Sequence, residues 1–235
     1  YILLALNIIG FVFWQEMGSS IPVTFGYSTV PAEILLGHDI ITNSKIIENP
    51  VTGENILMPG LQPTPIPVYL TLITSMFMHG GWAHLGGNML FLWIFGDNLE
   101  HAMGHKRYLI FYLLCGVIAS LSHVFSASFL NDSTLVPSLG ASGAISGVLG
   151  GYLLLFPGRS VRVWILFTIV SLPAFLVLGV WFVFQLVNGM GTLGGNEAAG
   201  GVAYAAHIGG FVAGLVLVKL FRRRIVAIPD KRTSW

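Results

Sequence analysis

Long apolar runs separated by polar segments dominate the 235-residue chain. A helix needs about 20 residues to cross the ~30 Å hydrocarbon core of a bilayer, and shorter segments are tolerated inside a bundle. Six runs meet this requirement and predict transmembrane helices at residues 1–15, 82–100, 107–126, 140–156, 163–187 and 201–221. The first run starts at Tyr1 with no Met or basic stretch before it, so we expect upstream sequence to be missing.

A long connection joins the first two runs. Residues 16–68 hold seven of the eleven prolines, namely Pro22, Pro31, Pro50, Pro59, Pro63, Pro65 and Pro67. Because proline breaks helix interiors, the sequence predicts one long irregular loop here. The apolar segment 69–79 is too short to span a bilayer, and we expect it to lie in the interface or to dip into the protein.

The composition is that of a membrane protein. Apolar residues make up 54% of the chain and charged residues 9%, against about 25% charged in soluble domains. This excludes a soluble globular protein. A net charge of +1 offers no basic face for nucleic acid, and the single cysteine, Cys115, excludes an internal disulfide framework. We therefore predict an all-α polytopic membrane protein of six helices that contacts the lipid bilayer and has no nucleic-acid partner.

The basic residues predict its orientation. Ten of the eleven Lys and Arg residues fall in three groups that begin at Lys106, Arg159 and Lys219, and only Lys45 lies in the long loop. By the positive-inside rule these three groups are cytoplasmic. Six helices with both termini in the cytoplasm is the simplest topology, with residues 1–228 as one membrane domain and 229–235 as a cytoplasmic tail. The outer connections are then residues 16–68, 127–139 and 188–200.

Polar residues at membrane depth are functional candidates by default, and the first is Ser142. It lies in the segment Gly-Ala-Ser-Gly-Ala-Ile-Ser-Gly, from Gly140 to Gly147, where a loop turns into the fourth run. Free backbone N–H groups and the helix dipole at such a position favour an oxyanion. Taken alone, the pattern is more typical of an N-cap serine with glycine-based helix packing.

The second candidate is His207, in the sixth run. Gly210 and Gly214 form a small-residue stripe after it, and Gly143 and Gly147 provide a matching stripe on the fourth run. Such stripes allow two helices to approach closely. We therefore expect the fourth and sixth helices to pack together, with His207 against the start of the fourth.

Counting along the helices places Ser142 and His207 at one depth. Ser142 lies 17 residues before Arg159 and His207 lies 15 residues before Arg222, which correspond to about 25 Å and about 22 Å of helix. A lone intramembrane histidine is more often a packing residue than a base. Agreement in depth with a glycine-flanked serine favours a serine–base pair.

The third candidate is the pair His84 and Asn88 at the outer end of the second run. Four residues apart, they share one helix face and present an imidazole and a carboxamide as neighbouring donors. Asn88 lies 18 residues before Lys106, about 27 Å along a helix, at the same level again. Alternatively, both residues tie helices together by hydrogen bonds.

A zinc site is another alternative, because four histidines lie in or near the apolar runs: His79, His84, His123 and His207. The chain has no H-E-x-x-H motif and no carboxylate at this depth to act as a base. We therefore expect neither a metal nor another cofactor.

Together these motifs resemble the rhomboid family of intramembrane serine proteases. The resemblance covers residues 75 to 216 and rests on G-x-S-G at 140–143, H-x-x-x-N at 84–88 and A-H-x-x-G-x-x-x-G at 206–214. A G-x-x-x-E-x-x-x-G pattern at 96–104 also fits.

The resemblance implies a Ser142–His207 dyad, with His84, Asn88 and the Ser142 backbone N–H binding the oxyanion. It also implies a six-span core of the bacterial type, in the inner membrane of a bacterium. The expected reaction is cleavage of single-pass membrane proteins in or near their transmembrane segments. Alternatives are a catalytically inactive relative that binds transmembrane segments for quality control, and a channel or transporter, for which the sequence shows no midplane charges.

The sequence departs from the family pattern in two places. No arginine precedes Arg107, so the Trp-Arg pair that many members carry in the first loop is missing. Ser146 stands where the best-studied members have a tyrosine that stacks on the histidine. A serine hydroxyl can hydrogen-bond the imidazole instead of stacking on it, and the sequence alone leaves open how His207 is held.

Overall fold

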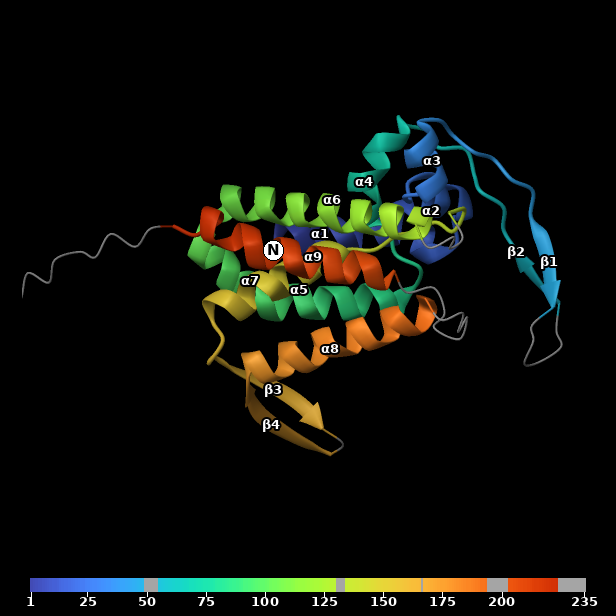
Figure 1. The fold of residues 1–235 in the computed structure, drawn as a ribbon. Coiled ribbons are helices and arrows are strands. Elements are labelled where there is room, and N and C mark those ends of the chain that lie inside the picture. Colours follow the sequence, from blue (N-terminus) through green and yellow to red (C-terminus); the bar gives the residue numbers. More distant parts are fainter. Residues whose placement is uncertain (49–54, 130–133, 166, 194–202, 224–235) are drawn as a thin grey trace, which may run out of the picture.

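The long helices lie side by side in one bundle (Figure 1). The computed structural model describes residues 1–48, 55–129, 134–165, 167–193 and 203–223. The main helices are α1 (Ile2–Ile9), which continues as a π-helical turn over Gly10–Trp14, α5 (Trp82–Met103), α6 (His105–Phe129), α7 (Ser142–Leu155), α8 (Ala174–Leu193) and α9 (Tyr204–Phe221). Each of the six predicted runs thus contains a helix, although the fifth helix begins later than predicted.

Helix α7 is the centre of the bundle and packs against α9, α6 and α5, with a smaller contact to α8. All its residues from 143 to 152 are buried. A Cβ atom at Gly210 would overlap the carbonyl oxygen of Gly143, and one at Gly214 would overlap that of Gly147. The backbones of α7 and α9 therefore touch directly, which only glycine permits.

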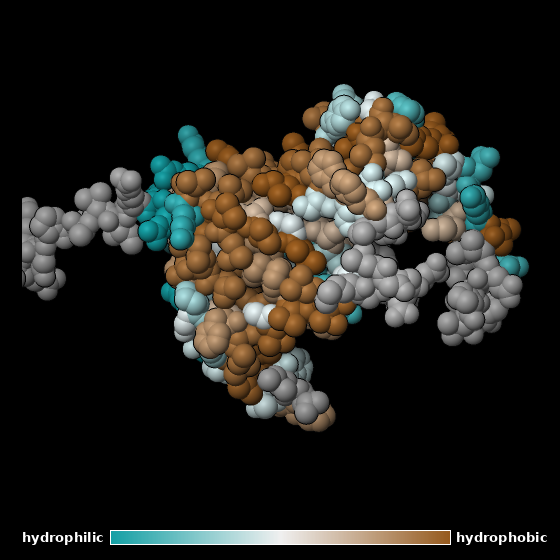
Figure 2. Space-filling model, viewed as in Figure 1, coloured by the Kyte–Doolittle hydropathy of each residue, from teal (hydrophilic) through white to brown (hydrophobic). Residues whose placement is uncertain are grey.

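The outer faces of the helices are apolar. Trp93, Ile110, Phe184 and Val216 are all more than half exposed, and Figure 2 shows hydrophobic residues covering most of the helical bundle on the side in view. Such a surface suits contact with lipid rather than water. Among the described helices, α6 and α9 have the length and hydropathy to cross a membrane. The segments Ile2–Trp14, Ser142–Leu155 and Ala174–Gly189 are also helical and apolar but shorter than 18 residues.

The predicted fifth span, residues 163–187, is wrong in its first part. Residues 160–173 form an antiparallel hairpin of β3 (Ser160–Ile165) and β4 (Thr168–Pro173), and α8 begins only at Ala174. The hairpin sequence is rich in Val, Ile and Thr, whose branched side chains favour strands. Pro173, which cannot donate a backbone hydrogen bond, separates the strand from the helix.

The prediction of one irregular loop over residues 16–68 is also wrong in part. This segment contains α2 (Ile21–Gly26), α3 (Pro31–Leu36) and an antiparallel hairpin of β1 (Lys45–Glu48) and β2 (Asn55–Met58), which projects from the bundle in Figure 1. Pro22 and Pro31 lie in the first turns of α2 and α3. Proline is tolerated there because that backbone N–H has no partner within the helix.

The segment before α5 folds into short helical turns, at Val68–Leu70, α4 (Thr71–Thr74) and Ser75–Phe77. Its Ser75 carbonyl accepts a hydrogen bond from the Gly140 N–H at 2.8 Å. Thr29, in the long loop, pairs with Ser138 just before α7. Two segments distant in sequence therefore hold the chain that leads into α7.

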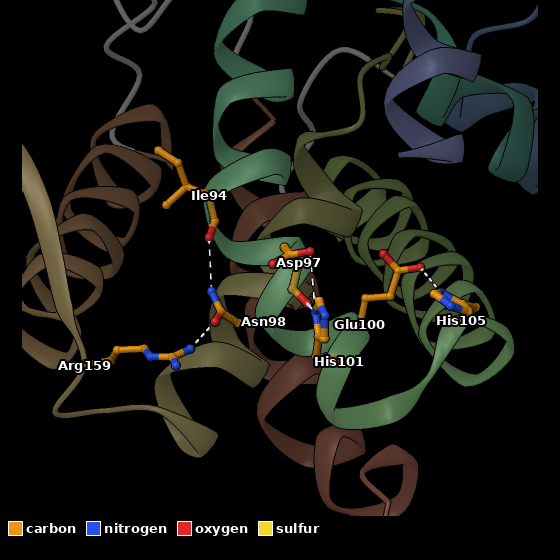
Figure 3. Close-up of polar contacts among 7 residues, drawn as sticks. All are labelled: Ile94, Asp97, Asn98, Glu100, His101, His105 and Arg159. Atoms are coloured by element: carbon orange, nitrogen blue, oxygen red, sulfur yellow. Dashed lines mark hydrogen bonds and ion pairs between the residues drawn. The ribbon is translucent and has the colours of Figure 1, made fainter.

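Polar contacts join α5 to its neighbours at the end opposite to residue 84 (Figure 3). The Glu100 carboxylate lies 2.6 Å from Nδ1 of His105, which begins α6. The Asn98 amide oxygen accepts a hydrogen bond from Arg159, which precedes β3. These contacts give the 96–104 pattern a structural role. The predicted tail, residues 229–235, lies outside the described residues.

Candidate active site

Ser142 and His207, which are 65 positions apart, are in direct contact. Ser142 is the first residue of α7, and His207 lies in the first turn of α9. Their side chains are half-buried, with Oγ of Ser142 2.8 Å from Nε2 of His207. The backbone contact of α7 and α9 described above sets this approach.

The other nitrogen of His207 contacts helix α8. Nδ1 of the imidazole lies 2.8 Å from Oε1 of Gln185, and the Trp181 ring centroid lies 6.2 Å from that of the imidazole. The sequence analysis missed both residues. A signal was present, since Gln185 is the one amide side chain in the apolar run 163–187, and polar residues at such depth are candidates by default.

Ser146 does not hold the imidazole of His207 in the structure. Its hydroxyl donates to the Ser142 carbonyl oxygen at 2.7 Å, one turn back along α7. Serine and threonine often bond in this way inside helices, and the donor is then no longer available to the imidazole. The imidazole of His207 is held from α8 instead.

His84 and Asn88 both lie beside Gly140, two residues before Ser142. A Cβ atom at Gly140 would come 2.7 Å from Nε2 of His84 and 3.7 Å from Nδ2 of Asn88. Gly140 also has a φ of +120°, a conformation that other residues rarely adopt. Glycine is therefore required here twice, by the backbone and by the close approach of two polar side chains.

Both side chains direct a donor towards this space. The Gly80 N–H donates to Nδ1 of His84 at 3.3 Å, so the ring proton of neutral His84 is on Nε2. Nδ2 of Asn88 is buried and has no hydrogen-bond partner among the described residues. An unpaired buried donor is rare and costs stability, and it is available to an acceptor that arrives with a ligand.

The buried ring of His79 packs against the ring of His84. Its ring is fully buried, 5.2 Å between centroids from that of His84, and Gln15 bonds both its backbone N–H and its carbonyl at 2.9 Å. Burial, with a smaller effect of His84, lowers the pKa of His79 to about 4. His79 is therefore neutral at physiological pH.

Within the described residues, no group of three or more His, Cys, Asp or Glu side chains is placed to hold a metal ion.

Comparison with known proteins gives this geometry a family. The Rhomboid domain matches residues 67–224. The chain belongs to the rhomboid family. It is an integral membrane protein, mostly helical, in which the serine–histidine contact lies inside the matched domain.

Three relatives illustrate the similarity. The chain is 33% identical to "Rhomboid protein 1, mitochondrial" of Saccharomyces cerevisiae over 156 residues, 66% of this chain and 43% of that protein. It is 31% identical to "Rhomboid-like protein 11, chloroplastic" of Arabidopsis thaliana over 166 residues, 70% of this chain and 57% of that protein. It is 37% identical to "Rhomboid protease GluP" of Bacillus subtilis over 145 residues, 61% of this chain and 24% of that protein. The matched part of the chain thus covers between 24% and 57% of the length of these relatives.

Proposed function

We propose that this rhomboid-family protein is a serine endopeptidase that cleaves single-pass membrane proteins in or near their transmembrane segments. The observation that carries the proposal is the 2.8 Å contact of the Ser142 hydroxyl with Nε2 of His207. The donors of His84 and Asn88 beside Gly140 add to it. One relative, GluP, is itself named a protease.

His207 acts as the general base in the proposed reaction. It takes the hydroxyl proton while Oγ of Ser142 attacks the carbonyl carbon of the scissile bond. The carbonyl electron pair moves onto oxygen, and the resulting oxyanion accepts hydrogen bonds from His84, Asn88 and the Ser142 backbone N–H. The imidazolium then gives its proton to the leaving amine as the C–N bond breaks. Water hydrolyses the acyl-enzyme by the same steps, with His207 again the base.

The proposed machinery is a dyad. In the described part of the chain, Asp97 and Glu100 (Figure 3) are the carboxylates of α5, and they lie in its last two turns whereas His84 lies in its first. The partner of Nδ1 of His207 is an amide. No carboxylate among the described residues therefore serves the histidine.

The proposed substrate is a helix that opens locally. A peptide bond in a helix is shielded by its own turns, so segments with Gly, Pro or β-branched residues cost less to unwind. We also propose that all six predicted helices span the membrane, with both termini in the cytoplasm. The bacterial inner membrane stays a prediction from the sequence, and the relatives named above do not support it, since two of them are a mitochondrial and a chloroplast protein.

The test is cleavage and fluorophosphonate labelling of the purified protein in detergent, with a reporter transmembrane substrate. The parent should cleave and take up the label, and Ser142→Ala should do neither while melting at the parental temperature. Ser171→Ala, an exposed serine of β4, is the matched control and should behave as the parent. A parent that binds the reporter without cleaving it or taking up label would instead be an inactive, substrate-binding rhomboid, and would overturn the proposal.

A further inference from the structure

We infer that Gln185 is a positioning residue for the Ser142–His207 pair. Its side-chain oxygen accepts the Nδ1 proton of the imidazole and so keeps the Nε2 lone pair facing the serine hydroxyl. The inference rests on the proposed protease function. It assigns to helix α8 a part of the site that the sequence motifs do not contain.

The first step is the hydrogen-bond count at His207. Each ring nitrogen has one partner at 2.8 Å: Oγ of Ser142 for Nε2, and Oε1 of Gln185 for Nδ1. A neutral imidazole carries one proton. The serine can donate to Nε2 only when that proton is on Nδ1, and an acceptor at Nδ1 stabilises this tautomer. The partner of Nδ1 therefore decides whether the pair is ready to react.

The second step is the placement of Gln185. Its side chain is only 6% exposed, and burying a carboxamide is costly unless it is hydrogen-bonded. Trp181 lies one turn earlier on the same face of α8, with its ring centroid 6.2 Å from that of His207 and 5.9 Å from that of Phe211. Helix α8 thus contacts both the ring and the nitrogen of the histidine.

The third step is the lack of another candidate. The Ser146 hydroxyl is bonded to the backbone of α7. The other titratable groups that influence His207 are His84 from α5 and His123 from α6, and neither is a carboxylate. Among the described residues, Gln185 is thus the side chain whose oxygen meets Nδ1.

Two substitutions of Gln185 distinguish a role in orienting the imidazole from a role of its side-chain volume in packing. Gln185→Met keeps the length of the side chain and removes the acceptor. We expect a fall in kcat of about 10–100-fold, by analogy with the loss of the hydrogen-bond partner that orients a metal-binding histidine, with KM and melting temperature close to parental. Gln185→Glu keeps an acceptor at Nδ1. We expect at least parental kcat, and a shift of the acid limb of the pH profile to higher pH, because a carboxylate favours the imidazolium.

The matched control is Asn188→Leu on the same helix. The Asn188 amide donates to the Phe184 carbonyl at 2.7 Å, so this variant also loses a polar group from α8 and should keep parental kcat and pH profile.

Parental kcat in Gln185→Met, or Gln185→Glu as slow as Gln185→Met with no shift in the pH profile, would overturn the inference. Either result, with a parent that cleaves and an inactive Ser142→Ala, leaves the proposed protease function intact. A parent that neither cleaves nor labels contradicts the function itself.

Discussion

The contact of α7 with α9 makes Gly210→Ala a sharp perturbation of the site. One methyl group is added, and the Cβ would overlap the Gly143 carbonyl oxygen and lie 3.2 Å from the Cβ of Ala119. The overlapped atom belongs to a helix backbone and cannot rotate away as a flexible side chain would. The two helices must therefore separate.

The expected magnitudes follow from this overlap. Adding a methyl group to a tightly packed contact typically lowers the free energy of unfolding by about 1–3 kcal/mol. Within a helix, alanine is more stable than glycine by up to about 1 kcal/mol, which offsets part of this loss. Activity should suffer more, because Ser142 adjoins Gly143 and His207 lies one turn from Gly210. A misplacement on the order of 1 Å can cost about 10²-fold in rate. It would also stretch the 2.8 Å serine–histidine contact beyond hydrogen-bond distance.

The assay compares Gly210→Ala with Gly179→Ala by thermal unfolding and reporter cleavage in one detergent. Gly179 lies in the second turn of α8, and a Cβ there meets no atom within 4 Å. The control therefore gains the same helix propensity without overlap, and should be as active as the parent and no less stable. If Gly210→Ala melts and cleaves like Gly179→Ala, the packing argument is refuted.

Further predictions concern the proposed oxyanion donors, Asn88 and His84, and the buried acid Glu33. Asn88→Ala and His84→Ala each remove one donor and should lower kcat by about 10²–10³-fold with KM little changed; parental kcat with only earlier melting would make Asn88 a helix-tying residue. Burial raises the pKa of Glu33, with the Asp39 carboxylate nearby. The parent therefore loses stability as pH rises through this raised pKa. The melting temperature of Glu33→Gln relative to the parent should rise as the pH rises above the ordinary glutamate pKa, and a difference independent of pH would contradict the assignment.

Depth could be predicted from the sequence because the rise of a helix is constant. Counting from Arg159 and Arg222 predicted that Ser142 and His207 share one level, and their side chains lie 2.8 Å apart. The glycine stripes predicted that the fourth and sixth helices pack together, and Gly210 lies on Gly143. Both arguments use properties of a single helix and need no knowledge of the rest of the fold.

The hairpin at 160–173 could not be predicted in the same way, since a short apolar run of β-branched residues fits a buried helix or a strand equally well. Gln185 was missed for another reason. A polar residue in an apolar run has no assigned partner until the rotation of its helix about its own axis is known, and that rotation is set by the contacts of Trp181 and Phe182 with Phe211.

Four helices each contribute one part of the site. Helix α7 is short and buried and packs against α5, α8 and α9, so side chains from all three reach its first residues. Helix α7 supplies Ser142, α9 the proposed base His207, α8 the proposed acceptor at Nδ1, and α5 the side chains of His84 and Asn88. The donor of Asn88 is unpaired among the described residues, at a typical cost of about 1–3 kcal/mol to the folded state. A donor held in this way needs no reorganisation when an oxyanion forms beside Gly140, so a group that destabilises the resting protein is the one that stabilises the proposed transition state.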